Sequence, residues 1–415
     1  MTSPDKPDAG KPDAGKPNAD KQTWASATRL VHAGDSEEAR AGFAARGVNP
    51  PVQRASTVVL PDAASLYGND HPTYGRAGLG VQASLEAALC ELEGAVAAKL
   101  FSSGAAAITA ALMTVLSAGD EVLVSAGAYA PTRRFCDGML ARFGVRTRYF
   151  APSAAAGEVL AMIGGQTRAV FLESPASLTF ELQDVPAIAS GARARGVLTL
   201  IDNTWGAGLL FRPLDHGVDL SVQALTKYVS GGSDVFMGSV AVRDPSLGER
   251  LLQTVWDTGW AVSPDDCYTV LRSLRTLTLR LARHGASALR VAQWLASQPE
   301  VARMLCPALP GSPDHALWKR DFSGTNGLFG LVLKAGPAHA ADAFLDALQV
   351  FKLGFSWGGF ESLAVSSDPQ VRNLGRGWRA DGALMRLHVG LEAPEDLIAD
   401  LRRGLDAFAA ACDQA

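Results

Sequence analysis

The chain has 415 residues, of which 47% are hydrophobic, and its formal net charge is −4. This length allows two or three domains with a large core, the composition excludes a largely disordered chain, and the slightly acidic balance does not suggest a nucleic-acid surface. The five cysteines form no CxxC pair and the seven histidines have no metal-ligand spacing with them, so a reduced cytoplasmic protein without a metal site is expected.

The chain begins with a low-complexity tail. Residues 6–20 read KPDAG, KPDAG and KPNAD, a repeat of charged, proline and small residues that cannot bury a core. We therefore expect residues 1–22 to be disordered, with a docking tail as the alternative. No apolar segment follows the charges, so the sequence does not predict a secretion signal.

Two segments between residues 71 and 119 have a distinctive composition. The glycine-rich loop HPTYGRAGLG carries Tyr74 and Arg76, which taken alone would be surface residues. The uncharged stretch 100–119 is long enough for a membrane span, but Ser, Thr and Gly interrupt it, and a buried helix at 105–117 is predicted instead. The N–H groups of Gly104 and Ala105 at its start can bind a phosphate, although an ordinary tight turn explains them equally well.

From residue 120 the chain alternates between short apolar strands and helices. Strands are expected at 121–125, 168–172, 197–201, 220–224 and 239–242. Helices are expected at 81–92, 131–143 and 185–195. This alternation is typical of a mainly parallel sheet covered on both faces, in which ligands bind beyond the strand ends. Tyr129, Asp202 and Lys227 follow such ends.

Two of these strands end in an acid and a lysine. VLTLIDNTW carries Asp202, and SVQALTKY carries Thr226 and Lys227. Each residue alone has a plain structural explanation, as a solvated lysine or as an aspartate that caps a helix or turn. An acid and a lysine 25 positions apart on two apolar strands suggest one cofactor held at both ends. Pyridoxal phosphate needs a lysine for its aldehyde and a carboxylate for its ring nitrogen.

After residue 273 the pattern changes to that of a smaller α/β domain. A long amphipathic helix is expected at 274–297, with most of its arginines on a solvated face, and a polar loop at 310–322. Further strands and helices are expected at 327–333, 340–348, 384–389 and 395–410. We therefore divide the chain into a tail at 1–22, an extended arm at 23–78, a large domain at 79–273 and a small domain at 274–415.

The motifs, taken in order, resemble the pyridoxal-phosphate enzymes of cysteine and methionine metabolism, and among these the bacterial cystathionine β-lyase branch. The resemblance covers roughly residues 24–410 and includes NPPVQRAST, CELEG, FSSGAAA, FLESPAS, PALPGS, FSWGGFESL and MRLHVGLE. It implies an α/β, aspartate-aminotransferase-like structure of fold type I. Such a structure has a large domain with a mainly parallel seven-stranded sheet and a smaller C-terminal α/β domain.

The resemblance also implies roles around the cofactor. Lys227 would form the Schiff base with the cofactor and then take the α-proton of the substrate, with a pKa lowered by burial. Asp202 would hold the pyridine nitrogen protonated, and Tyr129 would stack on the ring. Thr226 would bind the phosphate.

The remaining site residues are likewise implied by the resemblance. The backbone at Gly104 and Ala105 would bind the phosphate together with Thr226. Tyr74 and Arg76 would reach the same phosphate from a partner subunit. The arm at 23–78 would then contact the partner subunit. The protein is therefore expected to be a homo-oligomer, most simply a dimer of dimers.

Substrate contacts are implied at three further positions. Arg386 would bind the α-carboxylate, because an arginine on an apolar strand needs an anion. Ser356 and Trp357 would line the mouth of the pocket.

Four positions depart from common family residues. Ala224 stands where many members have serine, and Ser177 where many have asparagine; both resemble the β-lyase branch. Ala77 and Phe355 stand where bacterial β-lyases often have arginine and tyrosine, at positions expected near the distal end of the substrate.

Three functions stay open at this point. The first is α,β-elimination of L-cystathionine to homocysteine, pyruvate and ammonia in methionine biosynthesis, with cystine and cysteine S-conjugates as further substrates. The second is a γ-lyase or O-acyl-homoserine sulfhydrylase of the same family, and the third is a non-catalytic, cofactor-binding regulatory protein. No nucleic acid or membrane is expected as a partner.

Overall fold

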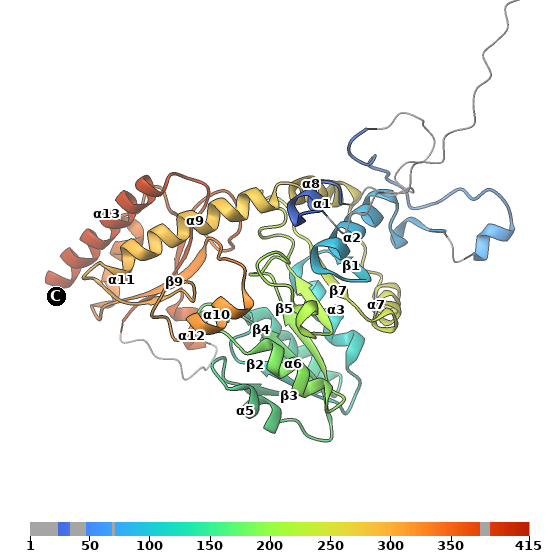
Figure 1. Cartoon of the computed structure of the whole chain (residues 1–415), viewed down its shortest axis with the longest axis horizontal. Coiled ribbons are helices and arrows are strands. Elements are labelled where there is room, and N and C mark those ends of the chain that lie inside the picture. The colour runs from blue at the N-terminus through green and yellow to red at the C-terminus, as the bar shows by residue number, and fades with distance from the viewer. Residues whose placement is uncertain (1–23, 34–46, 69–70, 374–381, 415) are drawn as a thin grey trace, which may run out of the picture.

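The computed structural model describes residues 24–33, 47–68, 71–373 and 382–414. The tail expected at residues 1–22 lies outside these ranges. The described chain is built around two β-sheets, each with its own helices (Figure 1). Helix α9 (Leu277–Ala296) connects the two parts, because its first turns pack into a core cluster of the large part and its later turns into that of the small part.

Seven strands form the larger sheet in the order β1-β7-β6-β5-β4-β2-β3. Strands β2 to β6 pair in parallel, whereas β7 is antiparallel to both of its neighbours. The strands are Ala97–Phe101 (β1), Glu121–Ser125 (β2), Arg146–Phe150 (β3), Thr167–Glu173 (β4), Leu198–Asp202 (β5), Leu220–Gln223 (β6) and Gly238–Val242 (β7). The predicted mainly parallel seven-stranded sheet is therefore confirmed.

Helices cover both faces of this sheet, because its central strands are apolar on both sides. On one face α2 (Gly80–Glu93) and α8 (Pro264–Leu274) pack together, and on the other α3 (Gly104–Val115) packs with α7 (Pro245–Thr258). The shorter helical segments are Ala130–Phe135 (α4), the π-helical turn Cys136–Leu140 (η5), Ala156–Ala161 (α5), Val185–Arg193 (α6) and Pro213–His216 (η6).

The parallel topology brings the predicted site residues to one edge. In the strand register, Glu173 at the end of β4 pairs with Asp202 at the end of β5, and Asp202 pairs with Val222 of β6. Tyr129 and Lys227 each follow four residues after the end of a neighbouring strand. Parallel strands present their carboxyl ends together, which is why residues far apart in the sequence meet there.

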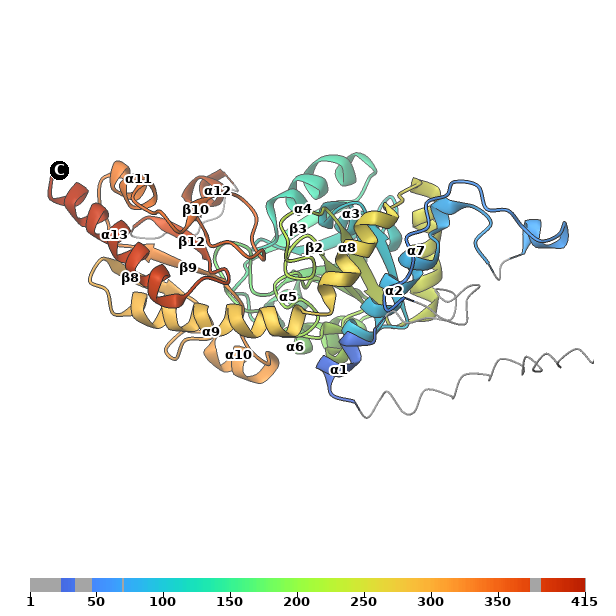
Figure 2. The same ribbon diagram turned by 90° about the horizontal axis from the view of Figure 1, so that it is seen from above.

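The smaller sheet has five strands in the order β10-β11-β12-β9-β8. Its strands are Val301–Leu305 (β8), Leu328–Leu333 (β9), Lys352–Leu353 (β10), Leu363–Ser366 (β11) and Leu384–His388 (β12). Later turns of α9 pack with α11 (Ala338–Asp346) and α13 (Pro394–Asp413) in the core beside this sheet, and Figure 2 shows α9 and α13 running next to each other. The short helices α10 (His315–Asp321) and α12 (Asp368–Asn373) complete this part.

The helix expected at 274–297 is wrong in its start, because α8 ends at Leu274 and α9 begins only at Leu277. Arg280 is an exception to the expectation that most arginines of this helix lie on a solvated face. Its guanidinium donates to the carbonyl oxygens of Tyr228 and Val229 at 2.5 and 3.2 Å, and burial lowers its pKa to about 10. These carbonyls belong to the turn after Lys227, which no local pattern in α9 could reveal.

Two further expectations differ from the structure. The loop expected at 310–322 contains α10, whose Trp318 packs between apolar residues of both parts. The strands β1 and β3 have no predicted counterpart. The sequence of β1, AAKLF, is rich in alanine and carries a lysine, Lys99, that pairs with Glu86 of α2 at 2.8 Å. These elements depend on tertiary packing more than on local propensity.

The N-terminal arm projects from the large part. Its middle, with the short turn η3 (Ala64–Tyr67), extends away from the body, whereas Arg54 contacts Asp265 and η4 (Gly75–Ala77) lies beside Trp256 (Figures 1 and 2). Val59 and Tyr67 are 93% and 92% exposed, which is unusual for two large apolar side chains in one short segment. Upstream, α1 (Ser26–Val31) packs on the large part through Leu30. The contact of this arm with a partner subunit stays a prediction.

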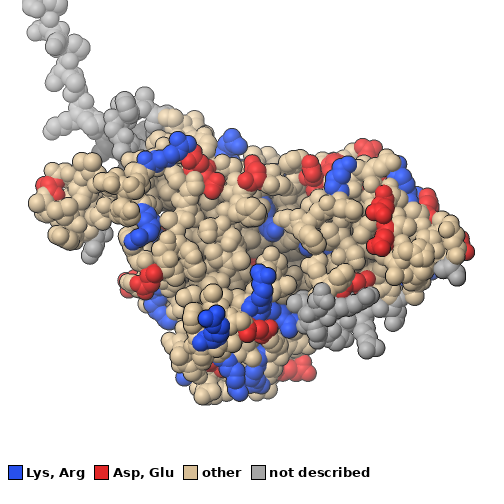
Figure 3. Space-filling model, turned by 180° about the vertical axis from the view of Figure 1, so that it is seen from behind, with Lys and Arg blue, Asp and Glu red and all other residues tan. Residues whose placement is uncertain are grey.

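No helix within the described ranges combines the length and apolarity needed to cross a membrane. Likewise, the described residues contain no group of three His, Cys, Asp or Glu side chains placed to hold a metal ion. Basic and acidic side chains are interspersed over the face shown in Figure 3.

Candidate active site

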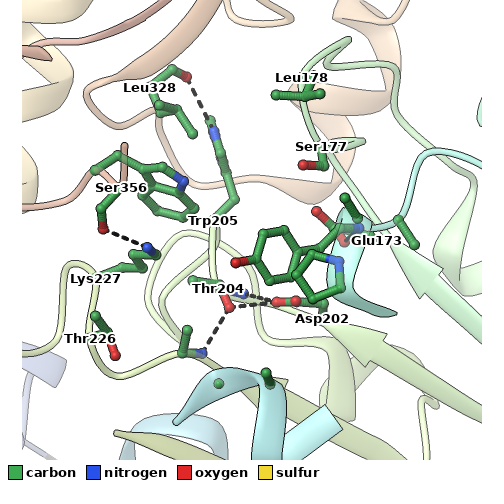
Figure 4. A pocket seen from close by; sticks show the side chains of 18 of the residues that line it. Glu173, Ser177, Leu178, Asp202, Thr204, Trp205, Thr226, Lys227, Leu328 and Ser356 are labelled. Carbon is green, nitrogen blue, oxygen red and sulfur yellow. Dashed lines mark hydrogen bonds between the residues drawn. The ribbon is translucent and has the colours of Figure 1, made fainter. Parts of the chain in front are cut away.

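A cavity of about 470 Å³ lies beyond the carboxyl ends of the large sheet, where the 355–357 loop and β12 of the small part face it. Most of the predicted site residues line this one cavity. They are Gly104, Ala105, Tyr129, Asp202, Thr226, Lys227, Ser356, Trp357 and Arg386. Figure 4 shows Lys227 and Ser356 on one side of the cavity, with Glu173, Ser177 and Leu178 across from them.

Lys227 projects into the cavity from the turn after β6. Its Nζ donates to Ser356 Oγ at 2.6 Å and lies 5.4 Å from the ring centre of Trp357 (Figure 4). Burial, followed by the positive charge of Arg386, lowers the pKa of the Lys227 amine to about 8, against an opposing effect of Asp202. A neutral amine is therefore available close to physiological pH, as a proton acceptor requires.

Asp202 is buried and held in one orientation. Its Oδ1 accepts from the backbone N–H of Thr204 at 3.0 Å and from the Thr204 hydroxyl. The same hydroxyl accepts from the Ala224 N–H at 2.9 Å, which ties the end of β5 to the segment that leads to Lys227 (Figure 4). Burial raises the pKa of Asp202, and the Thr204 bonds and Lys227 act against this. Both Thr204 bonds use Oδ1, so Oδ2 stays available to a ligand.

The start of α3 forms an anion cradle. Ser103 accepts from the N–H groups of Ala106 and Ala107, at 3.1 and 3.0 Å, while the N–H groups of Gly104 and Ala105 have no acceptor among the described residues. A Cβ on Gly104 would lie 2.5 Å from the Cβ of Ala224, so only glycine lets the helix start so close to β6. Helix N-termini of this kind bind phosphate groups.

The Thr226 hydroxyl lines the cavity but is already engaged. It donates to the carbonyl oxygen of Met237 at 3.1 Å and accepts from the Met237 N–H at 3.0 Å. This closes the loop between β6 and β7 and leaves no hydroxyl proton for a phosphate. The role of Thr226 at the phosphate stays a prediction.

Arg386 faces the cavity from β12 without a carboxylate partner among the described residues. One guanidinium nitrogen donates to the Ser356 carbonyl oxygen at 3.2 Å. Burial lowers the pKa of Arg386 to about 10, with Tyr129 acting in the opposite direction, and the group stays charged at neutral pH. A half-buried cation with donors to spare is suited to bind a carboxylate.

Tyr129 stands at the rim between the two acidic strand ends. Its backbone N–H donates to Glu173 Oε2 at 2.6 Å, and its side chain is 44% exposed. Burial, followed by the charges of Asp202 and Glu173, raises the pKa of its phenol. The phenol is therefore protonated at neutral pH.

Tyr74 and Arg76 do not reach this cavity within one chain. The Arg76 guanidinium lies 5.6 Å from the Tyr74 ring centre and 5.5 Å from that of Trp256, beside a separate, small pocket that Ala77 also lines. Phe355, by contrast, lines the Lys227 cavity. Ala77 and Phe355 are both expected near the distal end of the substrate, but within one chain only Phe355 lies at the site.

Three residues with a clear place in the site have no assigned role in the sequence interpretation. Thr204 orients Asp202, and its signal is a hydroxyl two residues after an aspartate. Glu173 ends β4 beside Asp202, and its signal is an acid at the end of an apolar strand. Phe236, which also lines the cavity, is 77% exposed and has no signal in the sequence.

The match to a family model decides the family. The model described as "Cys/Met metabolism PLP-dependent enzyme" matches residues 27–406. The chain belongs to this family. Cystathionine beta-lyase MetC of Escherichia coli is 42% identical over 393 residues, which are 91% of this chain and 97% of that protein. Cystathionine beta-lyase of Bordetella avium is 41% identical over 388 residues, which are 91% of this chain and 97% of that protein.

Solved structures agree with the sequence relatives. The crystal structure of metB from Corynebacterium glutamicum matches with a TM-score of 0.87 and 29% identity, covering 94% of this chain and 99% of that one. The expectations of an enzyme, of fold type I and of pyridoxal phosphate as cofactor are thereby confirmed.

The residues present fit this cofactor. Three groups face one cavity. They are an amine with a pKa of about 8, a buried carboxylate with one oxygen available to a ligand, and a helix N-terminus with two N–H groups that have no acceptor among the described residues. These are the three kinds of group that an aldehyde, a pyridine nitrogen and a phosphate require.

Proposed function

We propose that this family member is a carbon–sulfur β-lyase that splits L-cystathionine, with water, into homocysteine, pyruvate and ammonia, and that it acts also on cystine and cysteine S-conjugates. The observation that carries the proposal is the pairing of the Lys227 amine, held at Ser356, with the Arg386 cation in one cavity. The two named bacterial relatives, both cystathionine beta-lyases at 41–42% identity, support the choice of substrate.

In this proposal the cofactor is held at three points. Lys227 would be its covalent attachment, Asp202 Oδ2 would accept from its ring nitrogen, and the N–H groups of Gly104 and Ala105 would bind its phosphate. When bound, pyridoxal phosphate supplies an electron sink for the electron pair left on the α-carbon. Thr204 fixes the orientation of Asp202 and leaves its Oδ2 available, because the Thr204 bonds occupy only Oδ1.

The substrate is positioned by the small part of the chain. Arg386 binds the α-carboxylate in a two-pronged contact, which places the α-carbon beside Lys227. The Lys227 Nζ takes the α-proton, and its lowered pKa keeps a large fraction of the amine neutral above about pH 8. Ser356 Oγ orients that amine, and Tyr129, which lines the same cavity, would stack on the cofactor ring.

Assembly completes the site in this proposal. Tyr74 and Arg76 lie outside their own cavity on an arm that projects from the body, which fits a role at the phosphate of a neighbouring copy. We therefore propose a homo-oligomer, a dimer of dimers, with sites shared between subunits. All five cysteines carry free thiols, which supports a reducing compartment and the cytoplasm as the location.

One experiment tests the reaction. The purified protein is given L-cystathionine, and the oxo acid produced is identified. Pyruvate supports β-elimination, whereas 2-oxobutyrate would show a γ-lyase and contradict the proposal. A γ-lyase needs a second proton transfer, and position 355 holds a phenylalanine, which cannot carry a proton. We therefore expect pyruvate.

A further inference from the structure

A buried aromatic cluster lies directly behind Lys227 and consists of Tyr228, His284, Trp357 and His388. The ring centre of Tyr228 is 5.3 Å from that of His284, 5.4 Å from that of Trp357 and 5.9 Å from that of His388. Tyr228, His284 and His388 are each 1% exposed. The cluster joins four segments: the turn after Lys227, helix α9, the 355–360 loop and strand β12.

The 355–360 loop crosses the Lys227 backbone in a strained conformation. Ser356 has a φ of +89°, a left-handed value that is rare for a residue with a side chain. Gly358 has a φ of +87°, and a Cβ there would lie 2.7 Å from Tyr228 N and 2.8 Å from the Lys227 carbonyl carbon. Such a conformation persists only where the surroundings hold it.

His388 supplies a side-chain contact to this turn, in addition to the bond that Arg386 of the same strand donates to the Ser356 carbonyl oxygen at 3.2 Å. Its Nε2 lies 3.1 Å from the Gly358 backbone nitrogen, which donates to it, and 3.1 Å from the Gly359 carbonyl oxygen. Because one nitrogen cannot donate and accept at once, the Gly358 bond requires the tautomer with the proton on Nδ1, an atom that has no hydrogen-bond partner among the described residues. Burial lowers the pKa of His388 to about 3, and the charges of His284, Arg386 and Lys227 act in the same direction, so the ring is neutral.

We propose that His388 is a positioning residue for Lys227: by tying the 356–359 turn to β12, it holds the Ser356 hydroxyl against the Lys227 amine. The amine would otherwise lose its partner at 2.6 Å, and the turn would no longer cover its backbone. The expected effect of His388 on catalysis rests on the proposed function, whereas its expected effect on the pKa of the Lys227 amine does not.

The test uses two replacements of His388 and one control. His388→Leu keeps volume and removes the acceptor, whereas His388→Gln keeps an amide oxygen that can accept from Gly358. His315→Leu makes the same change at a histidine of α10 whose Nδ1 lies 3.0 Å from the Pro307 carbonyl oxygen, outside the cavity. In each cofactor-free protein, the pH dependence of reductive methylation at Lys227, read by mass spectrometry, reports the pKa of the amine.

The proposal expects half-maximal labelling of Lys227 near pH 8 in the wild type and His315→Leu. In His388→Leu the displaced turn admits water to the amine, and because burial is the main cause of the lowered pKa, the midpoint should rise by about one pH unit or more toward 10.5. His388→Gln should restore most of the wild-type value. With cofactor bound, kcat/KM of His388→Leu should fall roughly tenfold to a hundredfold, since a buried N–H loses its acceptor.

Unchanged labelling in a folded His388→Leu protein would overturn the proposal. If both variants fail to fold, hydrogen exchange of the wild type decides: fast exchange at the Gly358 amide contradicts the inference, and strong protection supports it. If the protein does not act on cystathionine, the proposed function is wrong. The labelling of Lys227 still tests the role of His388 in that case, because it does not depend on the substrate.

Discussion

The most direct test of the substrate clamp is Arg386→Ala. This change removes the cation that faces the cavity and leaves the substrate carboxylate in a partly buried place without a partner. A charge-assisted hydrogen bond contributes about 1.5–3 kcal/mol, and for a two-pronged contact in a half-buried site we expect a loss of about 3 kcal/mol. At about 1.4 kcal/mol for each factor of ten, this is a reduction of about a hundredfold in kcat/KM.

The assay is steady-state pyruvate release from cystathionine. Since the α-carboxylate is bound in both the ground state and the transition state, most of the loss should appear in KM. Arg386→Lys keeps the charge but not the planar fork, and should lose only about tenfold. The control is Arg320→Ala on α10. Arg320 forms an ion pair with Asp184 on the surface, so this substitution should leave activity unchanged. A KM of Arg386→Ala within about threefold of wild type would refute the carboxylate assignment.

Three further predictions follow from the site. Lys227→Ala should abolish both the visible absorption of the bound cofactor and turnover; normal turnover would contradict the mechanism. Mixed oligomers of Arg76→Ala and Lys227→Ala subunits should regain part of the activity, because one hybrid site has both residues, and no recovery despite proven exchange of subunits would count against shared sites. Cystine and apolar S-alkyl cysteines should compete well with cystathionine because Ala77 and Phe355 are neutral, and Ala77→Arg should shift preference toward cystathionine; a wild-type preference above about a hundredfold would show that other residues supply the distal contacts.

Local patterns in the sequence predicted five of the seven strands of the large sheet, but not β1 and β3. Short apolar strands that alternate with helices predict a parallel sheet, and a parallel sheet places its carboxyl ends on one edge. Asp202 and Lys227 follow two such strands, so the pattern by itself predicts that they meet. The resemblance to a family then gave Arg386, an arginine on an apolar strand, its ligand. It also extended the prediction to Ser356 and Trp357, for which neither periodicity nor spacing carried a signal.

Tertiary structure alone decided how these residues are held. Ser356 reaches the Lys227 amine across 129 positions, the Thr204 hydroxyl joins β5 to the segment before Lys227, and Arg280 turns from a helix surface to the carbonyl after Lys227. A periodic pattern records which face of an element is apolar, but not which distant backbone group lies opposite a given side chain. The position of such distant groups depends on how the two sheets and α9 pack together. This packing determines the pKa of Lys227 and places His388 behind that residue.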